Sequence, residues 1–173
     1  DVSSQVAQSF VTRDAVSATT EEELATRKAE TARQEAAVQL ASYAKAYSGP
    51  SVSDFLKNPA YPSFSLASVF SVAQKYIGTP YVYGGATPAG FDCSGYVMFV
   101  YAQFGISMPH SSTAQGNMGK RISIQDAVPG DLVIMPGHDG FYAGNGNIMD
   151  APKPGGYVSI RPISASPMPR AGL

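Results

Sequence analysis

The chain has 173 residues, a formal net charge of −1 and a single cysteine. A charge balance so close to neutral argues against nucleic acid or an anionic membrane as the main partner, and one cysteine cannot form an internal disulfide. The length suits one domain with an appendage, large enough to bury a core. No apolar stretch approaches the roughly 20 residues that a membrane span requires.

The start of the chain lacks the basic and apolar segments of a secretion signal. Asp1 lies inside sequence that is typical of a helix, so we expect a mature fragment of a longer precursor.

Residues 1–49 are rich in Ala, Glu, Gln and Thr, and predict a helix over Thr20–Tyr47. Thr20 and Glu23 have the spacing of a capping box, and Gly49-Pro50 is a stop signal. Because most apolar positions are alanine, this helix cannot build a core alone. We expect it to pack on the rest of the chain or to end a longer coiled coil.

Residues 48–66 contain three prolines among serines, which is typical of a linker. The composition therefore divides the chain into an N-terminal helical segment with its linker, residues 1–66, and a compact domain, residues 67–173.

The second part begins with helical patterns and ends with strand patterns. The order of helices before antiparallel strands predicts an α+β fold, with helices packed on a small antiparallel sheet. The expected elements are an amphipathic helix over 69–77, an apolar helix over 96–104, strands over 131–135, 140–143 and 147–151, and a last strand over 157–163.

Cys93 lies where a glycine-rich turn gives way to the apolar helix. A helix N-terminus favours a thiolate, so this cysteine is a candidate nucleophile. The alternative is a buried thiol that packs as a small hydrophobic group.

A thiol nucleophile needs a base, and the chain has only His110 and His138. His138 opens a strand, which holds a base more rigidly than the loop of His110. Asp150, on the next strand, is the candidate that orients His138. A turn centred on Gly144 pairs His138 with Asp150. A two-residue turn at Asn145-Gly146 instead pairs Asp150 with Phe141, and His138 then faces the other side of the sheet. Both registers are open.

Metal and cofactor chemistry is not expected. His138, Asp139 and Asp150 are potential ligands, but adjacent residues of a strand point to opposite faces.

Several short motifs occur in a fixed order between residues 67 and 163, and together they resemble the NlpC-type cell-wall peptidases, which are papain-like bacterial cysteine peptidases. These motifs are Gly78-Thr-Pro-Tyr-Val-Tyr-Gly-Gly85, Gly90-Phe-Asp-Cys-Ser-Gly95, Pro129-Gly-Asp-Leu132, His138-Asp-Gly140, Gly144-Asn-Gly146 and Asp150-Ala-Pro152. Residues 1–66 take no part in the resemblance.

The resemblance implies Cys93 as nucleophile, His138 as base and Asp150 as the third, variable polar residue. It also implies that Tyr81 lines the catalytic pocket and that Asp92 and Ser94 contact the peptide. Asp92 is equally well placed to meet a free substrate amine or to cap the helix.

Six further residues are compared with the family pattern. Ser112 and Gln115 match it and are interpreted as structural. Tyr83 replaces a tryptophan, and Tyr96 replaces a leucine, which requires a partner for its hydroxyl. Asp139 replaces an aliphatic residue and is expected to face away from the thiol. His110 stands where arginine is frequent.

The implied reaction is hydrolysis of the amide between γ-D-glutamate and a diamino acid in peptidoglycan stem peptides. We expect a monomer, since nothing in the sequence demands more, without metal or cofactor, secreted or associated with the cell wall, whose signal segment is not in this chain. The alternatives are a peptidoglycan-binding pseudoenzyme, or a papain-like amidase or acyltransferase that acts on another amide.

The N-terminal part carries a separate hypothesis. Phe55, Tyr61 and Phe64 lie just before the compact domain, within chain reach of its cleft. The hypothesis is that residues 1–66 cover the active site within the same molecule.

Overall fold

The computed structural model describes residues 19–163 and 170–171. The predicted parts 1–66 and 67–173 also contain residues 1–18, 164–169 and 172–173, which lie outside the described residues. The chain divides into two compact units at residue 34, and residues 35–173 contain the folded core. The described residues of the first unit belong mainly to the first part of α1 (Glu21–Ala46), and their side chains are exposed.

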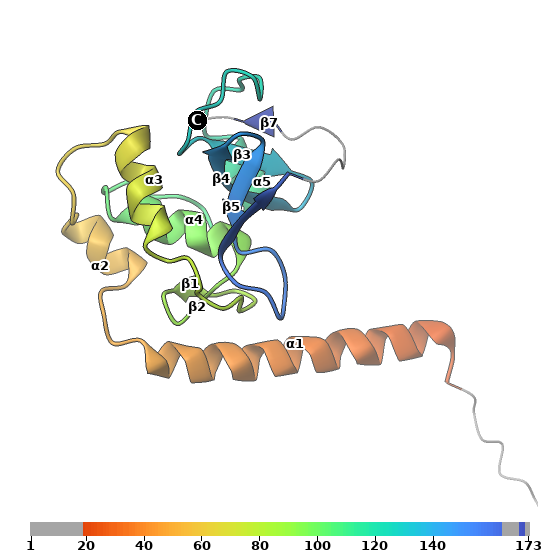
Figure 1. The fold of residues 1–173 in the computed structure, drawn as a ribbon. Coiled ribbons are helices and arrows are strands. Elements are labelled where there is room, and N and C mark those ends of the chain that lie inside the picture. Colours follow the sequence, from red (N-terminus) through yellow and green to blue (C-terminus); the bar gives the residue numbers. More distant parts are fainter. Residues whose placement is uncertain (1–18, 164–169, 172–173) are drawn as a thin grey trace, which may run out of the picture. The chain divides into compact units, whose positions relative to one another are not determined.

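The second unit combines short helices with a small antiparallel sheet, which confirms the α+β prediction (Figure 1). Its other helices are α2 (Val52–Lys57), α3 (Leu66–Gln74), α4 (Cys93–Ala102) and α5 (Ser112–Gly116). Its strands are β1 (Ala86–Thr87), β2 (Gly90–Phe91), β3 (Leu132–Met135), β4 (His138–Gly144), β5 (Asn147–Asp150), β6 (Ser159–Pro162) and β7 (Arg170–Ala171).

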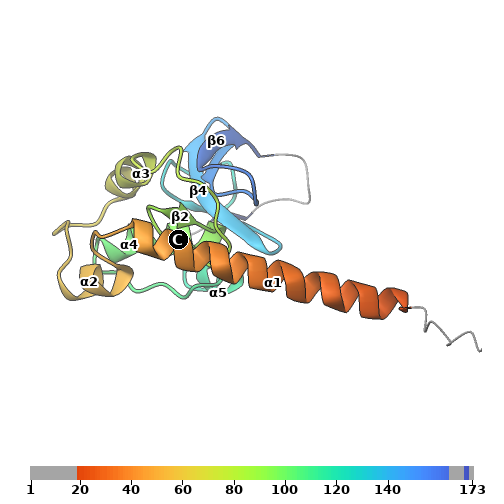
Figure 2. The same ribbon diagram turned by 90° about the horizontal axis from the view of Figure 1, so that it is seen from below.

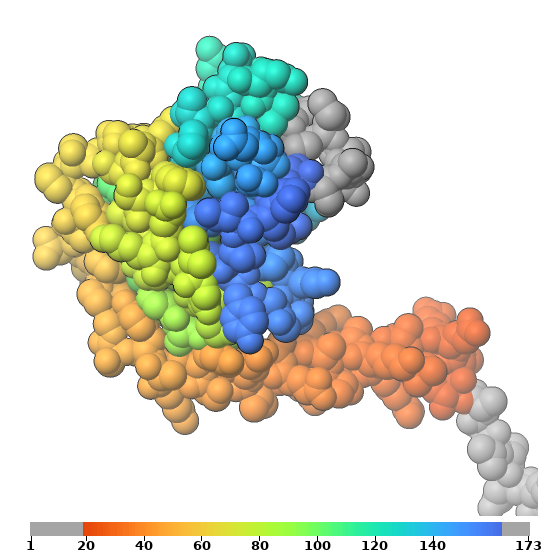
Figure 3. All heavy atoms as spheres, in the orientation of Figure 1, coloured from red at the N-terminus to blue at the C-terminus, as the bar shows by residue number. Residues whose placement is uncertain are grey.

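The main sheet has the strand order β6-β5-β4-β3-β7, and β1 and β2 form a separate small ribbon. The apolar helix α4 packs against β4, with Tyr96 and Tyr101 against Phe141. Helices α2 and α5 flank α4 (Figure 2). The segment after α3 joins the residues before β6 through hydrogen bonds of Gly78 and Thr79 with Val158, so the α3 segment and the late strands form one continuous surface (Figure 3).

The residues expected as a linker contain a helix. Ser51 caps α2 through a capping box with Asp54, and Phe55 packs edge-on against Phe99 at 5.5 Å between ring centroids. The composition of this segment did not predict the helix, because the helix is short and prolines flank it. The boundary between residues 66 and 67 stays a prediction.

The predicted N-terminal helix is confirmed, including its capping box, because Thr20 and Glu23 exchange hydrogen bonds of 3.1 Å. Tyr96 also has the partner that it requires, since its hydroxyl donates to the carbonyl of Ala73 at 2.5 Å. Within the described residues, no helix is both long and apolar enough to cross a membrane.

Candidate active site

Cys93 is the first residue of α4, with its backbone held by the preceding turn. Asp92 caps the helix by accepting a hydrogen bond from the Gly95 amide at 2.7 Å. A side chain at Gly95 would clash with the carbonyl oxygen of Gly85, so the glycines let two backbone segments touch here. The thiol therefore lies at a fixed position beside the positive end of a helix.

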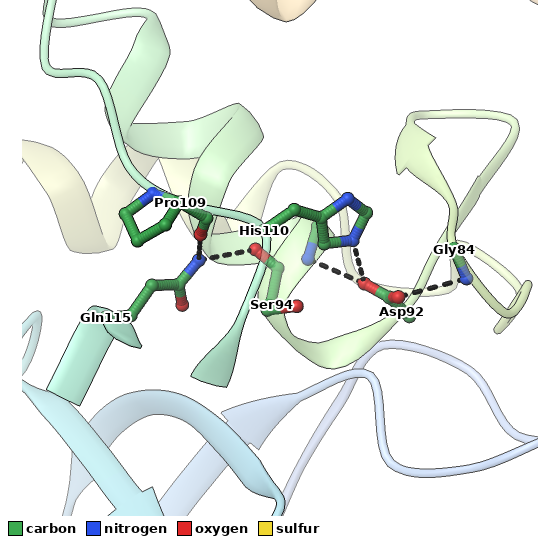
Figure 4. A network of polar contacts seen from close by, with 7 residues as sticks. Gly84, Asp92, Ser94, Pro109, His110 and Gln115 are labelled. Carbon is green, nitrogen blue, oxygen red and sulfur yellow. Dashed lines mark hydrogen bonds and ion pairs between the residues drawn. The ribbon is translucent and has the colours of Figure 1, made fainter. Parts of the chain in front are cut away.

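Asp92 has three protein partners (Figure 4). Its second oxygen accepts from the Gly84 amide at 3.0 Å, and its first also lies 2.8 Å from Nε2 of His110. The hydrogen bond to Asp92 raises the pKa of His110 against the opposing effect of burial. Of the two predicted roles for Asp92, the structure contains the helix cap.

Gln115 braces the nucleophile segment from the other side (Figure 4). Its side-chain amide is buried and donates to the carbonyls of Ser94 at 2.9 Å and Pro109 at 2.7 Å. These contacts agree with the structural interpretation of Gln115. Ser94 is almost fully buried, and it therefore presents little side chain to solvent.

His138 opens β4, and its Nε2 lies 2.5 Å from Oδ2 of the fully buried Asp150. Burial lowers the pKa of His138, but hydrogen bonds to Asp150 and to Cys93 outweigh it and raise the pKa to about 9. The structure thus brings together the three side chains predicted as catalytic.

The hairpin register that brings His138 to Asp150 differs from both registers considered above. The turn is Asn145-Gly146, but a bulge between Tyr142 and Gly144 shifts the pairing, so that Phe141 lies opposite Met149. Gly140 then lies opposite Asp150, and His138 is its diagonal neighbour. A Cβ at Gly140 would lie 2.7 Å from the Cβ of Asp150, so the missing side chain makes room for the carboxylate.

Arg161 is a further polar partner of this site, which no local sequence pattern indicated. Its Nε donates to Oδ1 of Asp150 at 3.0 Å, and its Nη2 donates to Oδ2 at 2.6 Å. In the sequence, Arg161 is one residue of an alternating strand. Its pairing depends on the β5–β6 register, which local patterns do not specify.

Tyr81 lies near the nucleophile. Burial raises its pKa to about 12, with further contributions from Cys93 and Asp92. Its backbone amide donates to the Gly156 carbonyl at 2.9 Å, which ties the turn before α4 to the loop before β6. Tyr83, two residues further, is 64% exposed.

Asp139 is the least satisfied group of the site. It is fully buried, and neither carboxyl oxygen has a hydrogen-bond partner. Burial raises its pKa to about 7; the charge of His138 opposes this, and the charges of Asp92 and Asp150 add to it. The sequence did not indicate that this carboxyl would be buried and unpartnered.

Comparisons with known proteins place this arrangement in context. The profile described as NlpC/P60 family matches residues 78–171. A gamma-DL-glutamyl hydrolase of Bacillus subtilis is 42% identical over 101 residues, which are 53% of this chain and 24% of that protein. The chain spans about a quarter of the length of the curated relatives that it matches first.

Solved structures show the same fold. The NlpC/p60 domain of the peptidoglycan hydrolase SagA is 36% identical with a TM-score of 0.59, over 64% of this chain and 99% of that chain. The resuscitation-promoting-factor-interacting protein RipA, in a form mutated at a glutamate, is 32% identical with a TM-score of 0.56, over 62% of this chain and 60% of that chain.

Proposed function

Because the chain belongs to the NlpC/P60 family, we propose that it is a cysteine peptidase that hydrolyses the amide between γ-D-glutamate and a diamino acid in peptidoglycan stem peptides. The observation that carries the proposal is the 2.5 Å contact between His138 and Asp150, beside Cys93 at the start of α4. The names of two relatives, a gamma-DL-glutamyl hydrolase and a peptidoglycan hydrolase, support the substrate class.

His138 is the proposed base. Its Nε2 faces Asp150, which leaves Nδ1 as the ring nitrogen for Cys93. With a pKa raised to about 9, the imidazole is protonated at neutral pH and stabilises a thiolate on Cys93.

In the first step, the Cys93 thiolate attacks the carbonyl carbon of the γ-glutamyl amide. The backbone N–H of Cys93, at the helix N-terminus, donates to the oxyanion. Protonated His138 gives its proton to the amine of the diamino acid, the C–N bond breaks, and a thioester remains.

In the second step, neutral His138 accepts a proton from water, and the hydroxide attacks the thioester. The C–S bond breaks, the γ-carboxyl of glutamate leaves, and the thiolate–imidazolium pair returns. Asp150 orients the ring through both steps and stabilises the imidazolium.

The spacing of the two partners supports this assignment. RipA has been solved in forms mutated at a cysteine, at a histidine and at a glutamate, and the last two are twelve positions apart. His138 and Asp150 have the same separation.

Tyr81, Asp92 and Ser94 are the proposed substrate contacts. A phenol whose pKa is about 12 stays protonated, so Tyr81 is able to donate a hydrogen bond to the bound peptide. Asp92, held by Gly84, Gly95 and His110, offers a fixed negative charge for a free amine of a trimmed stem peptide.

We place this activity outside the cell or in the cell wall, in a monomer without cofactor. Residues 1–66 are proposed to cover the site. Leu40 of α1 supports this, because a Cβ added at Gly84, in the turn before Cys93, would lie 3.5 Å from the Leu40 side chain.

The test is digestion of purified sacculi, followed by mass spectrometry of the released peptides. The whole chain is expected to free a new amine on the diamino acid, and Cys93→Ser to lower the rate by more than about a thousandfold. Unchanged thermal unfolding would confirm that Cys93→Ser is folded.

Three other outcomes would overturn parts of this proposal. Binding of sacculi without any cleavage by the whole chain indicates a pseudoenzyme. A new terminus at a different amide indicates an amidase or acyltransferase. Full activity of Cys93→Ser excludes the thiol mechanism.

A further inference from the structure

Asp150 has a second partner besides the histidine. It is fully buried, and Arg161 binds both its oxygens through Nε and Nη2 at 3.0 and 2.6 Å. This two-pronged geometry is the strongest arrangement between a guanidinium and a carboxylate. One oxygen of Asp150 is therefore shared between His138 and Arg161.

The sheet itself creates this contact. In the β5–β6 register, Asp150 lies opposite Ser159 and Ile148 lies opposite Arg161. Asp150 and Arg161 are diagonal neighbours on one face of the sheet. The Arg161 side chain is 36% exposed, so its charge keeps some contact with water while its fork reaches the buried carboxylate.

A second buried carboxyl in the same site shows why a cation matters here. Asp139 is as buried as Asp150 but has no partner, and its pKa rises to about 7. Burial disfavours the charged form of a carboxyl unless an opposite charge lies nearby. Asp150 has that charge in Arg161.

We propose that Arg161 is a positioning residue for the Cys93–His138–Asp150 triad. It balances the charge of Asp150 and holds its carboxylate against the histidine. This inference rests on the proposed cysteine peptidase function.

The charges of the four groups sum to zero when Cys93 is a thiolate and His138 an imidazolium. Removal of the Arg161 cation leaves the site with a net negative charge. A more negative site binds protons more tightly. The thiol is then protonated to a greater extent at any given pH, and less of the reactive thiolate remains.

Because Cys93 is the only cysteine, its thiolate reactivity can be measured without substrate. Alkylation of Cys93 by iodoacetamide adds one mass increment to the intact protein, and its rate is followed from pH 5 to pH 9. Arg161→Gln is expected to slow alkylation about tenfold at pH 6 and to move the acid limb of the profile to higher pH. Arg121→Gln, which removes an exposed arginine in the loop before β3, is the matched control and is expected to match the wild type.

Two further variants separate this role from general destabilisation. Arg161→Lys keeps the charge and is expected to restore most of the reactivity at pH 6. In an Asp150→Asn background, Arg161→Gln is expected to slow alkylation less than it does in the wild type, because the carboxylate that Arg161 holds against His138 is gone and only the charge of Arg161 is lost. Arg161→Met is the second neutral variant, and circular dichroism identifies which of the two is folded.

A folded neutral variant that alkylates like the wild type at every pH overturns the proposal. Equal slowing with and without Asp150 also overturns it. Failure of the proposed function is recognised separately, because sacculi then stay intact in the wild type while the alkylation profile still reports on Arg161.

Discussion

Asp139 is the residue that fits its surroundings least well. Its neighbour His138 has two partners, whereas its own carboxyl oxygens have none. An unpartnered buried carboxyl is stable only in its protonated form, so its cost depends on pH.

The sign of that dependence follows from the two pKa values of Asp139. The carboxyl has a pKa of 3.8 in the unfolded chain and about 7 in the folded one. The folded state therefore binds more protons between about pH 4 and pH 7, and stability falls as the pH rises through this window. Above it, the penalty reaches about 4 kcal/mol of unfolding free energy.

We expect Asp139→Val to raise the melting temperature at pH 8 by about 5 °C more than at pH 5. Asp139→Asn is the matched control for charge; it should remove the same pH dependence and give a smaller gain at pH 8, because its amide remains buried. Calorimetry at both pH values measures these shifts. An equal gain for Asp139→Val at pH 5 and pH 8 would contradict a raised pKa for Asp139.

At this scale, local patterns predicted where the main side chains lie. A cysteine at a helix start and a histidine at a strand start are both readable from the sequence, and Cys93 and His138 occupy these places. Arg161 and the burial of Asp139 were not predictable, because each depends on which residue lies across the sheet.

The hairpin of β4 and β5 sets the geometry of the site at the scale of elements. Its bulge between Tyr142 and Gly144 moves Gly140 opposite Asp150. The sequence predicted the hairpin and offered Asn145-Gly146 as one of two turns. A bulge leaves no clear sequence signature here, so neither predicted register was correct.

This register leaves no room for a side chain at Gly140. An added Cβ would lie 2.7 Å from the Asp150 Cβ and 2.8 Å from the Met149 carbonyl oxygen, which is closer than real contacts allow. We expect Gly140→Ala to push Asp150 away from His138 and to lower kcat on muropeptides by about a hundredfold, as a displacement of about 1 Å does.

The matched control is Gly116→Ala, where the added Cβ would lie 2.8 Å from a methyl group of Ile134. It creates similar crowding in α5 and is expected to change stability with little effect on kcat. A Gly140→Ala variant with the kcat of the wild type would show that the close approach of Gly140 to Asp150 does not control the rate.

For the whole molecule, the order of helices and strands predicted the α+β class, and the resemblance of the ordered motifs implied the NlpC-type fold; both are confirmed. The packing of residues 48–64 was not predictable, because it depends on rings that meet across the chain. Tyr61 stacks on Phe104 and Phe64 lies beside Tyr101. These rings therefore contact the last turn of α4 and the residues just after it, and α1 remains the segment on which the proposed cover rests.

A shortened chain that begins at Tyr47 tests the cover, because it removes α1 and keeps the edge contact of Tyr47 with Phe99. If α1 leaves the site open one tenth of the time, its removal should raise kcat/KM on sacculi about tenfold. Leu40→Glu in the whole chain should give a similar gain by disrupting the contact beside Gly84. Val38→Glu, at a position 71% exposed on the same helix, is the matched control and should change nothing. A shortened chain no more active than the whole one would refute the cover, since a segment that shields the site cannot be removed without effect.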